Sequence, residues 1–334
     1  MKNFSMTLAT AGALTAAGIA ATATTASAQT NVQLYGRLDT SIDLMNNGQS
    51  SRTAISSNSS RWGLRGTEEL GGNLRALFNL EAGFSSDTGA GNGSFDRRAV
   101  VGLSGGFGQV VLGRDYTPFY SLLTRHFDFF GNAGAGASGD LLQFRSRESN
   151  SILYTMPKLG GFSGALMYTA DETDTGPAIN RAVGASLEWS GGGFGLGLGY
   201  HDRKASAAGD RRDLLLTGSY TIAGWRIGAQ YSRYEMSDDS FDHRSWGLSA
   251  QTKLGPGDLM VTYIDLDDKV VRDSGARKLS VGYYHALSKR TTVYAVLAYI
   301  DNDRNGKFAV GPDKQVVAAG ESARNLQFGI RHNF

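Results

Sequence analysis

The sequence predicts an all-β fold: a 16-stranded antiparallel transmembrane β-barrel with one long loop folded into its lumen. Three observations support this prediction. Apolar and polar residues alternate with a period of two through most of the chain, short and long connections alternate between the resulting segments, and an export signal precedes them all. The alternation gives each strand two unlike faces, and the connections give the barrel two unlike ends.

Residues 1–28 have the composition of a secretory signal peptide. Lys2 supplies the positive start, residues 8–23 form a mildly apolar core, and Ala26-Ser27-Ala28 is an A-x-A cleavage site. We therefore predict a signal peptide over 1–28 and a barrel domain over 29–334. Removal of residues 1–28 from the 334-residue chain leaves 306 and lowers the formal net charge from +2 to +1, because Lys2 is lost. The alternative is a short N-terminal helix that stays attached.

Composition excludes several classes of protein. Hydrophobic residues make up 41% of the chain and the mean hydropathy is −0.25, so the body lacks the runs of about 20 apolar residues that membrane helices need. A net charge of +2 is too balanced for a nucleic-acid binder that works by bulk positive charge. Cysteine is absent, which excludes a disulfide framework. Forty-five glycines with only five prolines fit many turns and closely packed strands.

The alternation is clearest in residues 32–44. One parity is mostly apolar, with Val32, Leu34, Leu38, Ile42 and Leu44, and the other is mostly polar. The same pattern predicts sixteen strands near 32–45, 60–70, 73–84, 95–104, 107–115, 146–156, 161–170, 180–190, 193–202, 211–221, 224–235, 243–254, 257–266, 276–286, 290–300 and 324–334.

Short turns and long polar segments alternate between these strands without a break. The predicted long connections are 46–59, 85–94, 116–145, 171–179, 203–210, 236–242, 267–275 and 301–323. In an up-and-down barrel this order places every long loop at one end, as in outer-membrane barrels with short periplasmic turns and long extracellular loops. Sixteen strands enclose an aqueous lumen that side chains cannot fill, so the apolar parity must face lipid.

Seven fragments, in order along the chain, resemble the general porins of Gram-negative bacteria, in particular the trimeric porins of beta-proteobacteria. They are residues 34–39, 60–72, 101–103, 112–114, 147–154, 287–291 and 329–334. The resemblance covers the whole chain. It implies a 16-stranded barrel, a homotrimer, a third long loop folded into the lumen, and passive diffusion of small hydrophilic solutes, often with a preference for anions.

The longest internal connection, 116–145, is the third of the long loops, and we predict that it forms the constriction of the pore. A connection this long inside a compact unit is usually functional or disordered, and a mobile surface loop is the alternative. It offers the carboxylates of Asp115, Asp128 and Asp140 to the lumen. Together with Glu81 on the third predicted strand, Asp115 and Asp128 form the predicted acidic side of the constriction.

The inward parity of neighbouring strands carries arginines, which we predict to form a basic wall of the constriction. Guanidinium stays charged at any relevant pH, and rings of arginine favour anions. The carboxylates of Glu69 and Glu81 balance the charge of the cluster. Strict parity places Arg114 outward, so whether it faces the lumen is left open. The alternative for each arginine is a solvated wall residue without selectivity. The resemblance favours Arg65, Arg98 and Arg147 as the core of the wall. The predicted wall is Arg37, Arg65, Arg75, Arg98 and Arg147.

The remaining motifs give weaker indications of function. Phe334 ends the apolar parity of the last strand, which favours an assembly signal over an ordinary amphipathic strand. Gly195, Gly197 and Gly199 alternate within a strand and suggest a close-packed wall or a subunit contact rather than a nucleotide loop. The five histidines have no metal spacing, and the acidic segment 265–273 lacks the glycine pattern of a calcium loop. We predict no metal and no cofactor.

These observations predict a general diffusion channel of the outer membrane, weakly selective for anions, and not an enzyme. Expected partners are two further copies of the chain, outer-membrane lipid and lipopolysaccharide, the barrel-assembly machinery acting on the C-terminal strand, and small hydrophilic solutes and ions, but no nucleic acid. The alternatives are a substrate-specific channel, an outer-membrane hydrolase and an adhesin. Single-channel conductance separates them: a large ohmic pore, saturation by one sugar, or no conductance.

Overall fold

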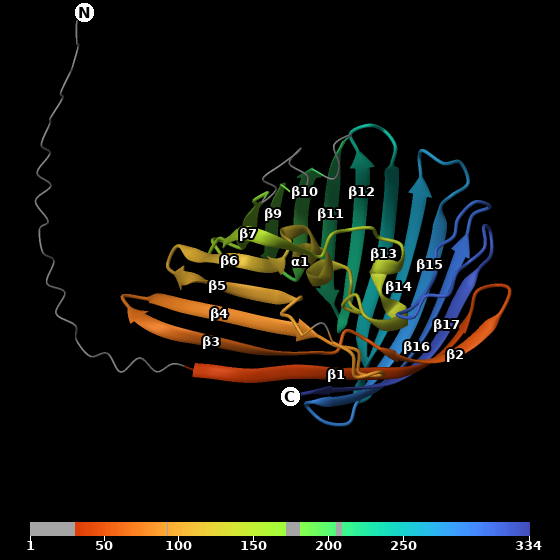
Figure 1. Cartoon of the computed structure of the whole chain (residues 1–334), viewed down its shortest axis with the longest axis horizontal. Coiled ribbons are helices and arrows are strands. Elements are labelled where there is room, and N and C mark those ends of the chain that lie inside the picture. Colours follow the sequence, from red (N-terminus) through yellow and green to blue (C-terminus); the bar gives the residue numbers. More distant parts are fainter. Residues whose placement is uncertain (1–30, 92, 172–180, 205–208) are drawn as a thin grey trace, which may run out of the picture.

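The computed structural model describes residues 31–91, 93–171, 181–204 and 209–334, so the predicted signal peptide lies outside the described residues. The chain forms a closed antiparallel barrel around a short helix (Figure 1). The helix is α1 (Pro118–His126). The strands are β1 (Asn31–Asn46), β2 (Ser51–Ser57), β3 (Arg61–Gly71), β4 (Leu74–Gly83), β5 (Arg98–Gly105), β6 (Gly108–Tyr116), β7 (Arg147–Thr155), β8 (Phe162–Thr169), β9 (Ala182–Gly191), β10 (Phe194–Lys204), β11 (Asp210–Ile222), β12 (Trp225–Met236), β13 (Asp242–Leu254), β14 (Gly257–Asp268), β15 (Ala276–Ala286), β16 (Thr291–Asn302) and β17 (Ala323–Asn333).

The seventeen strand segments occupy sixteen positions, because β2 and β3 lie end to end beside β1. The first half of β1 pairs with β3, and the second half pairs with β2. The two segments are separated at residues 58–60, where Ser59 has a left-handed backbone with φ of 61°. The prediction of sixteen barrel strands is confirmed. The predicted long loop over 46–59 is wrong, since a tight turn at 47–50 leads directly into β2.

Pairing between the first and last strands closes the barrel. The register runs from Arg37 opposite Asn333 to Asn46 opposite Arg324. Phe334 extends this pairing, because its backbone exchanges hydrogen bonds of 3.1 and 2.9 Å with Gly36. A Cβ at Gly36 would lie 2.2 Å from the Phe334 ring, so only glycine admits the ring at this place. The last side chain therefore lies over the seam of the barrel.

The outer face is apolar in every part of the wall, as the alternation predicts. On β10, for example, the outward residues Leu196 and Leu198 are 55% and 45% exposed, whereas inward His201 is 2% exposed. Exposed aromatic residues gather at two levels, as in the girdles of membrane barrels. Those nearer the long loops are Tyr168, Tyr200, Trp246 and Tyr299, and those nearer the short turns are Phe107, Phe162, Phe194 and Trp225. In the described residues, no helix is long and apolar enough to cross a membrane.

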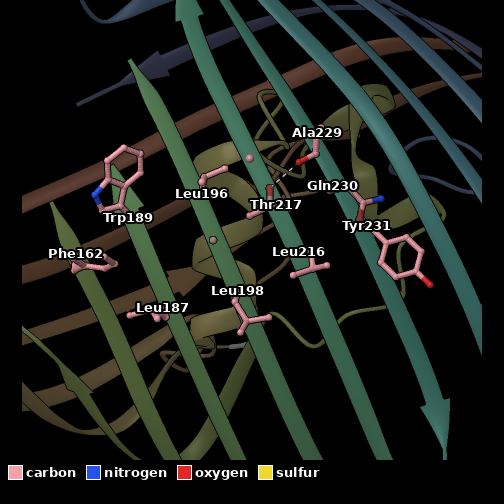
Figure 2. A pocket seen from close by; sticks show the side chains of 12 residues that line it. Phe162, Leu187, Trp189, Leu196, Leu198, Leu216, Thr217, Ala229, Gln230 and Tyr231 are labelled. Atoms are coloured by element: carbon pink, nitrogen blue, oxygen red, sulfur yellow. Dashed lines mark hydrogen bonds between the residues drawn. The ribbon is translucent and has the colours of Figure 1, made fainter. Parts of the chain in front are cut away.

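The outer wall of β8–β12 has an apolar hollow of about 620 Å³ (Figure 2). Its floor lies where Gly218 on β11 faces Ala229 on β12, since these two small residues stand opposite each other in the register. Leu196, Leu216 and Tyr231 rise around them. In a membrane barrel this surface is covered by hydrocarbon, so the hollow belongs to the lipid-facing wall.

Residues 117–146 connect β6 to β7 and lie inside the barrel, where α1 packs against β8–β12. Phe119, Leu122 and Leu123 face the wall and are buried there together with Phe127 and Phe130. Residues 303–322, between β16 and β17, also turn inward and bury Val310 and Val317 in the same apolar cluster. These two segments therefore fill one side of the lumen, and the other side stays open to water.

Candidate functional site

A cavity of about 530 Å³ separates the inward loop from the opposite wall. Thr117 begins the helix that forms one side of this cavity, because its hydroxyl accepts a hydrogen bond of 3.1 Å from the Tyr120 amide and Pro118 follows it. The described residues that line the cavity include five arginines and two tyrosines but no carboxylate. They are Arg37, Ser59, Arg61, Arg97, Tyr116, Tyr120, Ser121, Thr124, Arg125, Gly131, Asn132, Ser146 and Arg147.

Four of the five arginines come from the wall. Arg37 on β1 and Arg61 on β3 stand opposite each other in the register, so both guanidinium groups reach the cavity at one height. Arg97 comes from the segment just before β5, and Arg147 is the first residue of β7. The fifth, Arg125, belongs to the last turn of α1 and faces them from the loop. Arg125 is ion-paired with the enclosed Glu188 on β9, so the positive charge of the cavity is greatest on the wall side.

Tyr116 connects two of these arginines. Its hydroxyl oxygen accepts hydrogen bonds from Nη2 of Arg147 at 2.8 Å and from Nη2 of Arg97 at 3.2 Å. The Arg147 guanidinium also lies 4.3 Å from the centre of the Tyr116 ring, which is the geometry of a cation–π contact. Tyr116 in turn stacks on Tyr120 with ring centres 5.2 Å apart. Two like charges are thus held next to each other by one side chain.

The carboxylates lie behind the arginines rather than across from them. Glu81 on β4 is 5% exposed, and its oxygens lie 2.6 Å from Arg97 Nε and 3.5 Å from Arg61 Nε. Asp115 on β6 is equally enclosed and accepts a hydrogen bond of 2.8 Å from Arg98. Both predicted acidic residues therefore act as buried counter-ions within the wall itself. They reduce repulsion among the guanidiniums while leaving their outer edges to the water.

The prediction that Asp128 faces the lumen is wrong. Asp128 follows α1, is 2% exposed, and accepts a hydrogen bond of 2.6 Å from the Ser138 hydroxyl inside the loop. Burial raises the pKa of its carboxyl. Burial also raises the pKa of Tyr120, to about 12, so its hydroxyl stays neutral beside the arginines. The loop therefore does not oppose the basic wall with negative charge from these two residues.

Three residues of the predicted basic wall lie elsewhere. Arg65 is on the inward face of β3, four residues further from the cavity than Arg61, and its Nε donates to Gln33 at 3.2 Å. Arg75 lies at the short-turn end of β4, where it forms an ion pair of 2.5 Å with Glu69. Arg98 points inward but its Nη2 is held by Asp115. Arg114 pairs in register with Ala99 and donates to Ser149, so it does not line the cavity either.

Of the two roles that the sequence suggested for the glycines of β10, the structure shows close packing at the wall. Gly195, Gly197 and Gly199 face the lumen directly under α1, not a neighbouring subunit. A Cβ at Gly197 would lie 2.5 Å from the Leu122 side chain. A Cβ at Gly228 on β12 would lie 2.3 Å from the His126 carbonyl oxygen at the end of the helix. The absence of side chains here lets the helix rest on the backbone of the wall.

Asp140 fastens the inward loop to the barrel at a second place. One carboxylate oxygen accepts from the Lys278 ammonium on β15 at 2.7 Å and from the Gly311 amide at 3.1 Å. The other lies 3.0 Å from the Lys314 ammonium. Lys278 is 1% exposed and also donates to the Ala137 carbonyl. The predicted lumen-facing carboxylate is therefore the junction of the loop, the wall and the 303–322 segment.

Comparison with known proteins agrees with this architecture. The sequence model of one family, described as Gram-negative porin, matches residues 13–305. The chain belongs to the Gram-negative porin family. Outer membrane porin protein 32 of Delftia acidovorans is 34% identical to this porin over 96% of the chain and 99% of the relative. An outer membrane porin of Bordetella pertussis is 29% identical over 96% and 99% of the two chains. These relatives support an outer-membrane location.

Solved structures give the same result. An anion-selective porin from Comamonas acidovorans is 31% identical and superposes with a TM-score of 0.82 over 92% of this porin and 100% of that chain. OmpT of Vibrio cholerae in a trimer form has a TM-score of 0.71 over 91% and 99% of the chains at 18% identity, which supports the fold alone. The relatives are channels, and a general diffusion channel of the outer membrane is the function they support.

Sequence reasoning missed three arginines of this porin's cavity. Arg61 has the same parity as Arg65, so the alternation carried a signal for it. Arg97 fell within the predicted strand 95–104, on the parity opposite to Arg98, but β5 begins only at Arg98. Arg125 lies on a helix within the loop, where no period-two pattern applies. In the parts of the chain that the structure describes, no group of three or more metal-binding side chains is gathered.

Proposed function

We propose that this porin favours anions, and that the arginine-lined cavity sets this preference. The observation that carries the proposal is the arrangement of charge around the 530 Å³ cavity. Five guanidinium groups reach the water, whereas Glu81 and Asp115 are enclosed behind them. An anion passing between α1 and the wall meets the positive charge of the wall arginines, whereas the facing Arg125 is ion-paired with Glu188, and a cation is repelled by the wall. The name of the Comamonas neighbour, an anion-selective porin, supports the same direction.

Transport through such a channel is passive, since solutes move down their gradients through a water-filled gap and no chemical step is needed. We further propose that residues 1–28 are a cleaved export signal and that residues 116–145 form the constriction. We also propose a homotrimer, as the resemblance to trimeric porins implies, and contacts with lipopolysaccharide and with the barrel-assembly machinery through the C-terminal Phe334. The basic wall of the proposal is the set Arg37, Arg61, Arg97, Arg125 and Arg147.

The test replaces the two wall arginines that form no ion pair in the described residues. Arg37→Gln with Arg147→Gln removes two charges without leaving a buried carboxylate unpaired. At roughly 1 kcal/mol per charge in a partly screened site, we expect the anion-to-cation permeability ratio to fall by about tenfold or more. Reversal potentials of planar bilayers under a KCl gradient measure it.

The matched control is Arg75→Gln, because Arg75 lies at the short-turn rim in an exposed pair with Glu69. We expect this variant to keep the reversal potential of the parent protein. An unchanged reversal potential in the double variant would remove the cavity from the mechanism of selectivity. An equal loss in the control would instead show that selectivity depends on the total charge of the lumen.

A further inference from the structure

A second, smaller cavity opens from the arginine-lined cavity toward the short-turn end of the lumen. It has a volume of about 120 Å³ and lies between α1 and the strands β7, β8 and β9. The two cavities share Tyr116, Ser121 and Arg125 in their linings, so a solute among the arginines also faces the smaller space. A cavity of this volume holds several water molecules, and it therefore also admits a hydroxylated chain of about three carbon atoms.

The wall of this smaller cavity carries small side chains with free hydroxyl groups. Thr155 on β7, Ala165 on β8 and Ser186 on β9 stand side by side in register and face inward. Ser163 is the next inward residue of β8 toward the short turn, and it stands opposite Glu188. In the described residues, the hydroxyls of Thr155, Ser163 and Ser186 form no hydrogen bond with the protein. We call this space the hydroxyl pocket.

The packing of α1 does not explain the small residues of the hydroxyl pocket. Over β10 the helix lies directly on the backbone, where a Cβ at Gly197 would come within 2.5 Å of the Leu122 side chain. Over Ser163 and Ser186 the same helix leaves the space of about 120 Å³ open. Both serines are only half-buried, so a solute can reach them. Their side chains therefore border a cavity and do not form a contact.

Arg125 marks the boundary between the two cavities. It is paired with Glu188 through Nη1, and the other oxygen of this carboxylate lies 3.2 Å from His126 Nε2. The Arg125 side chain is still 55% exposed, and guanidinium carries five N–H donors, so some of them remain available to an anion. The hydroxyl pocket below it has a balanced charge. It suits neutral groups that both donate and accept hydrogen bonds, which is the property of a hydroxyl.

We propose that the arginine-lined cavity and the hydroxyl pocket together bind small anions that carry a hydroxylated chain, such as the phosphate ester of a polyol. The wall arginines attract the anion, and its phosphate contacts Arg125 at the boundary of the two cavities. The hydroxyls of the chain exchange hydrogen bonds with Ser163 and Ser186. The inference deepens the proposed function and rests on it, because the positive wall must first select the anion.

The experiment uses the full folded channel in planar bilayers with KCl on both sides. The two probes are glycerol 3-phosphate and n-propyl phosphate, which have the same charge and the same number of carbon atoms and differ only in two hydroxyls. The quantity measured is the concentration of each probe that halves the KCl current. We expect glycerol 3-phosphate to act at a concentration about threefold to tenfold lower, since each added hydrogen bond replaces one with water.

The variant Ser163→Ala with Ser186→Ala removes two hydroxyls of the pocket and no charge. We expect it to bring the two half-blocking concentrations within about twofold of each other. The matched control is Ser104→Ala, because Ser104 faces Arg75 in the register at the short-turn end of β5, away from the pocket. This control should keep the ratio of the parent channel.

Three outcomes would overturn the inference while the proposed function stands. They are equal half-blocking concentrations of the two probes in the parent channel, a ratio that survives in the double serine variant, and an equal loss of the ratio in Ser104→Ala. The reversal potential under a KCl gradient is recorded for each protein, because it reports anion preference independently of the probes. A parent channel without anion preference would refute the proposed function itself, and this inference with it.

Discussion

The two sides of the lumen have the same strand geometry but opposite roles. On β1, β3 and β7 the inward positions carry arginine, and their long side chains reach across the water to form one edge of the cavity. On β10 and β12 the equivalent positions carry Gly195, Gly197 and Gly228, and the helix α1 occupies the space. One side of the barrel supplies charge, and the other supplies room.

This difference shows how a wide barrel acquires a narrow passage. A sixteen-stranded lumen is too wide for side chains alone to constrict it. The glycine side places a whole helix against the wall, so the remaining gap is small enough for guanidinium groups to control. The arginine side depends on buried counter-ions, since Glu81 and Asp115 hold Arg97 and Arg98 in place. The proposed selectivity therefore depends on the glycines as much as on the arginines.

The largest effect is expected where the inward loop is fastened to β15. Asp140→Asn removes the negative partner of Lys278, whose ammonium is enclosed by the loop and β15. Because breaking a buried ion pair leaves an uncompensated charge, we expect a loss of about 3–5 kcal/mol in the free energy of unfolding. Urea titration of the folded barrel measures it. Lys314→Met removes only the half-exposed contact of the same carboxylate and should cost less than about 1 kcal/mol. Equal losses would show that Lys278 is not the anchor.

The next largest effect is expected from filling the space that glycine leaves. Gly228→Val places a Cβ 2.3 Å from the His126 carbonyl oxygen, so the helix must move toward the arginine wall. Overpacking of this kind costs about 1–3 kcal/mol, and the narrowed cavity should lower single-channel conductance. Gly218→Val is the matched control, because it lies on the neighbouring strand with its open side outward, 3.4 Å from Leu196. If both variants conduct like the parent, the helix does not define the width of the passage.

Period-two alternation predicted the strands and the face of each side chain, but it carries no information about height along the barrel. Arg37, Arg65 and Arg75 all have inward parity, yet only Arg37 reaches the cavity, whereas Arg75 lies at the short-turn rim. Height depends on strand tilt and on bulges, such as the register shift between Gly113 and Asp115, which are set by tertiary pairing. Asp128 was misplaced because the path of an irregular loop leaves no periodic signal.

A smaller effect tests whether the carboxylates behind the arginines matter to selectivity. Arg97→Gln removes one positive charge and releases the enclosed Glu81, so the anion-to-cation permeability ratio should fall by about tenfold. Adding Glu81→Gln to this variant restores the balance of charge, and the ratio should recover about half of the loss on a logarithmic scale. Reversal potentials measure both. A double variant no better than the single one would show that Glu81 is screened from the passage.

The smallest effect is expected at Tyr116, whose hydroxyl holds Arg97 and Arg147 together. Tyr116→Phe keeps the ring that stacks on Tyr120 and lies under the Arg147 guanidinium, but it removes the oxygen that accepts both hydrogen bonds. Each such bond contributes about 1 kcal/mol, and water replaces most of it in an open cavity, so the permeability ratio should change by no more than about twofold.

A clearer effect of Tyr116→Phe is expected in the current noise of the open channel. This noise should rise, because the two freed guanidiniums sample more positions in the passage. Tyr120→Phe is the control, since in the described residues the Tyr120 hydroxyl has no hydrogen-bond partner while its ring occupies the same stack. Open-channel noise that rises in Tyr116→Phe and not in Tyr120→Phe would assign Tyr116 the role of positioning the arginines. The same noise in both would mean that the guanidiniums are held by their contacts with the wall.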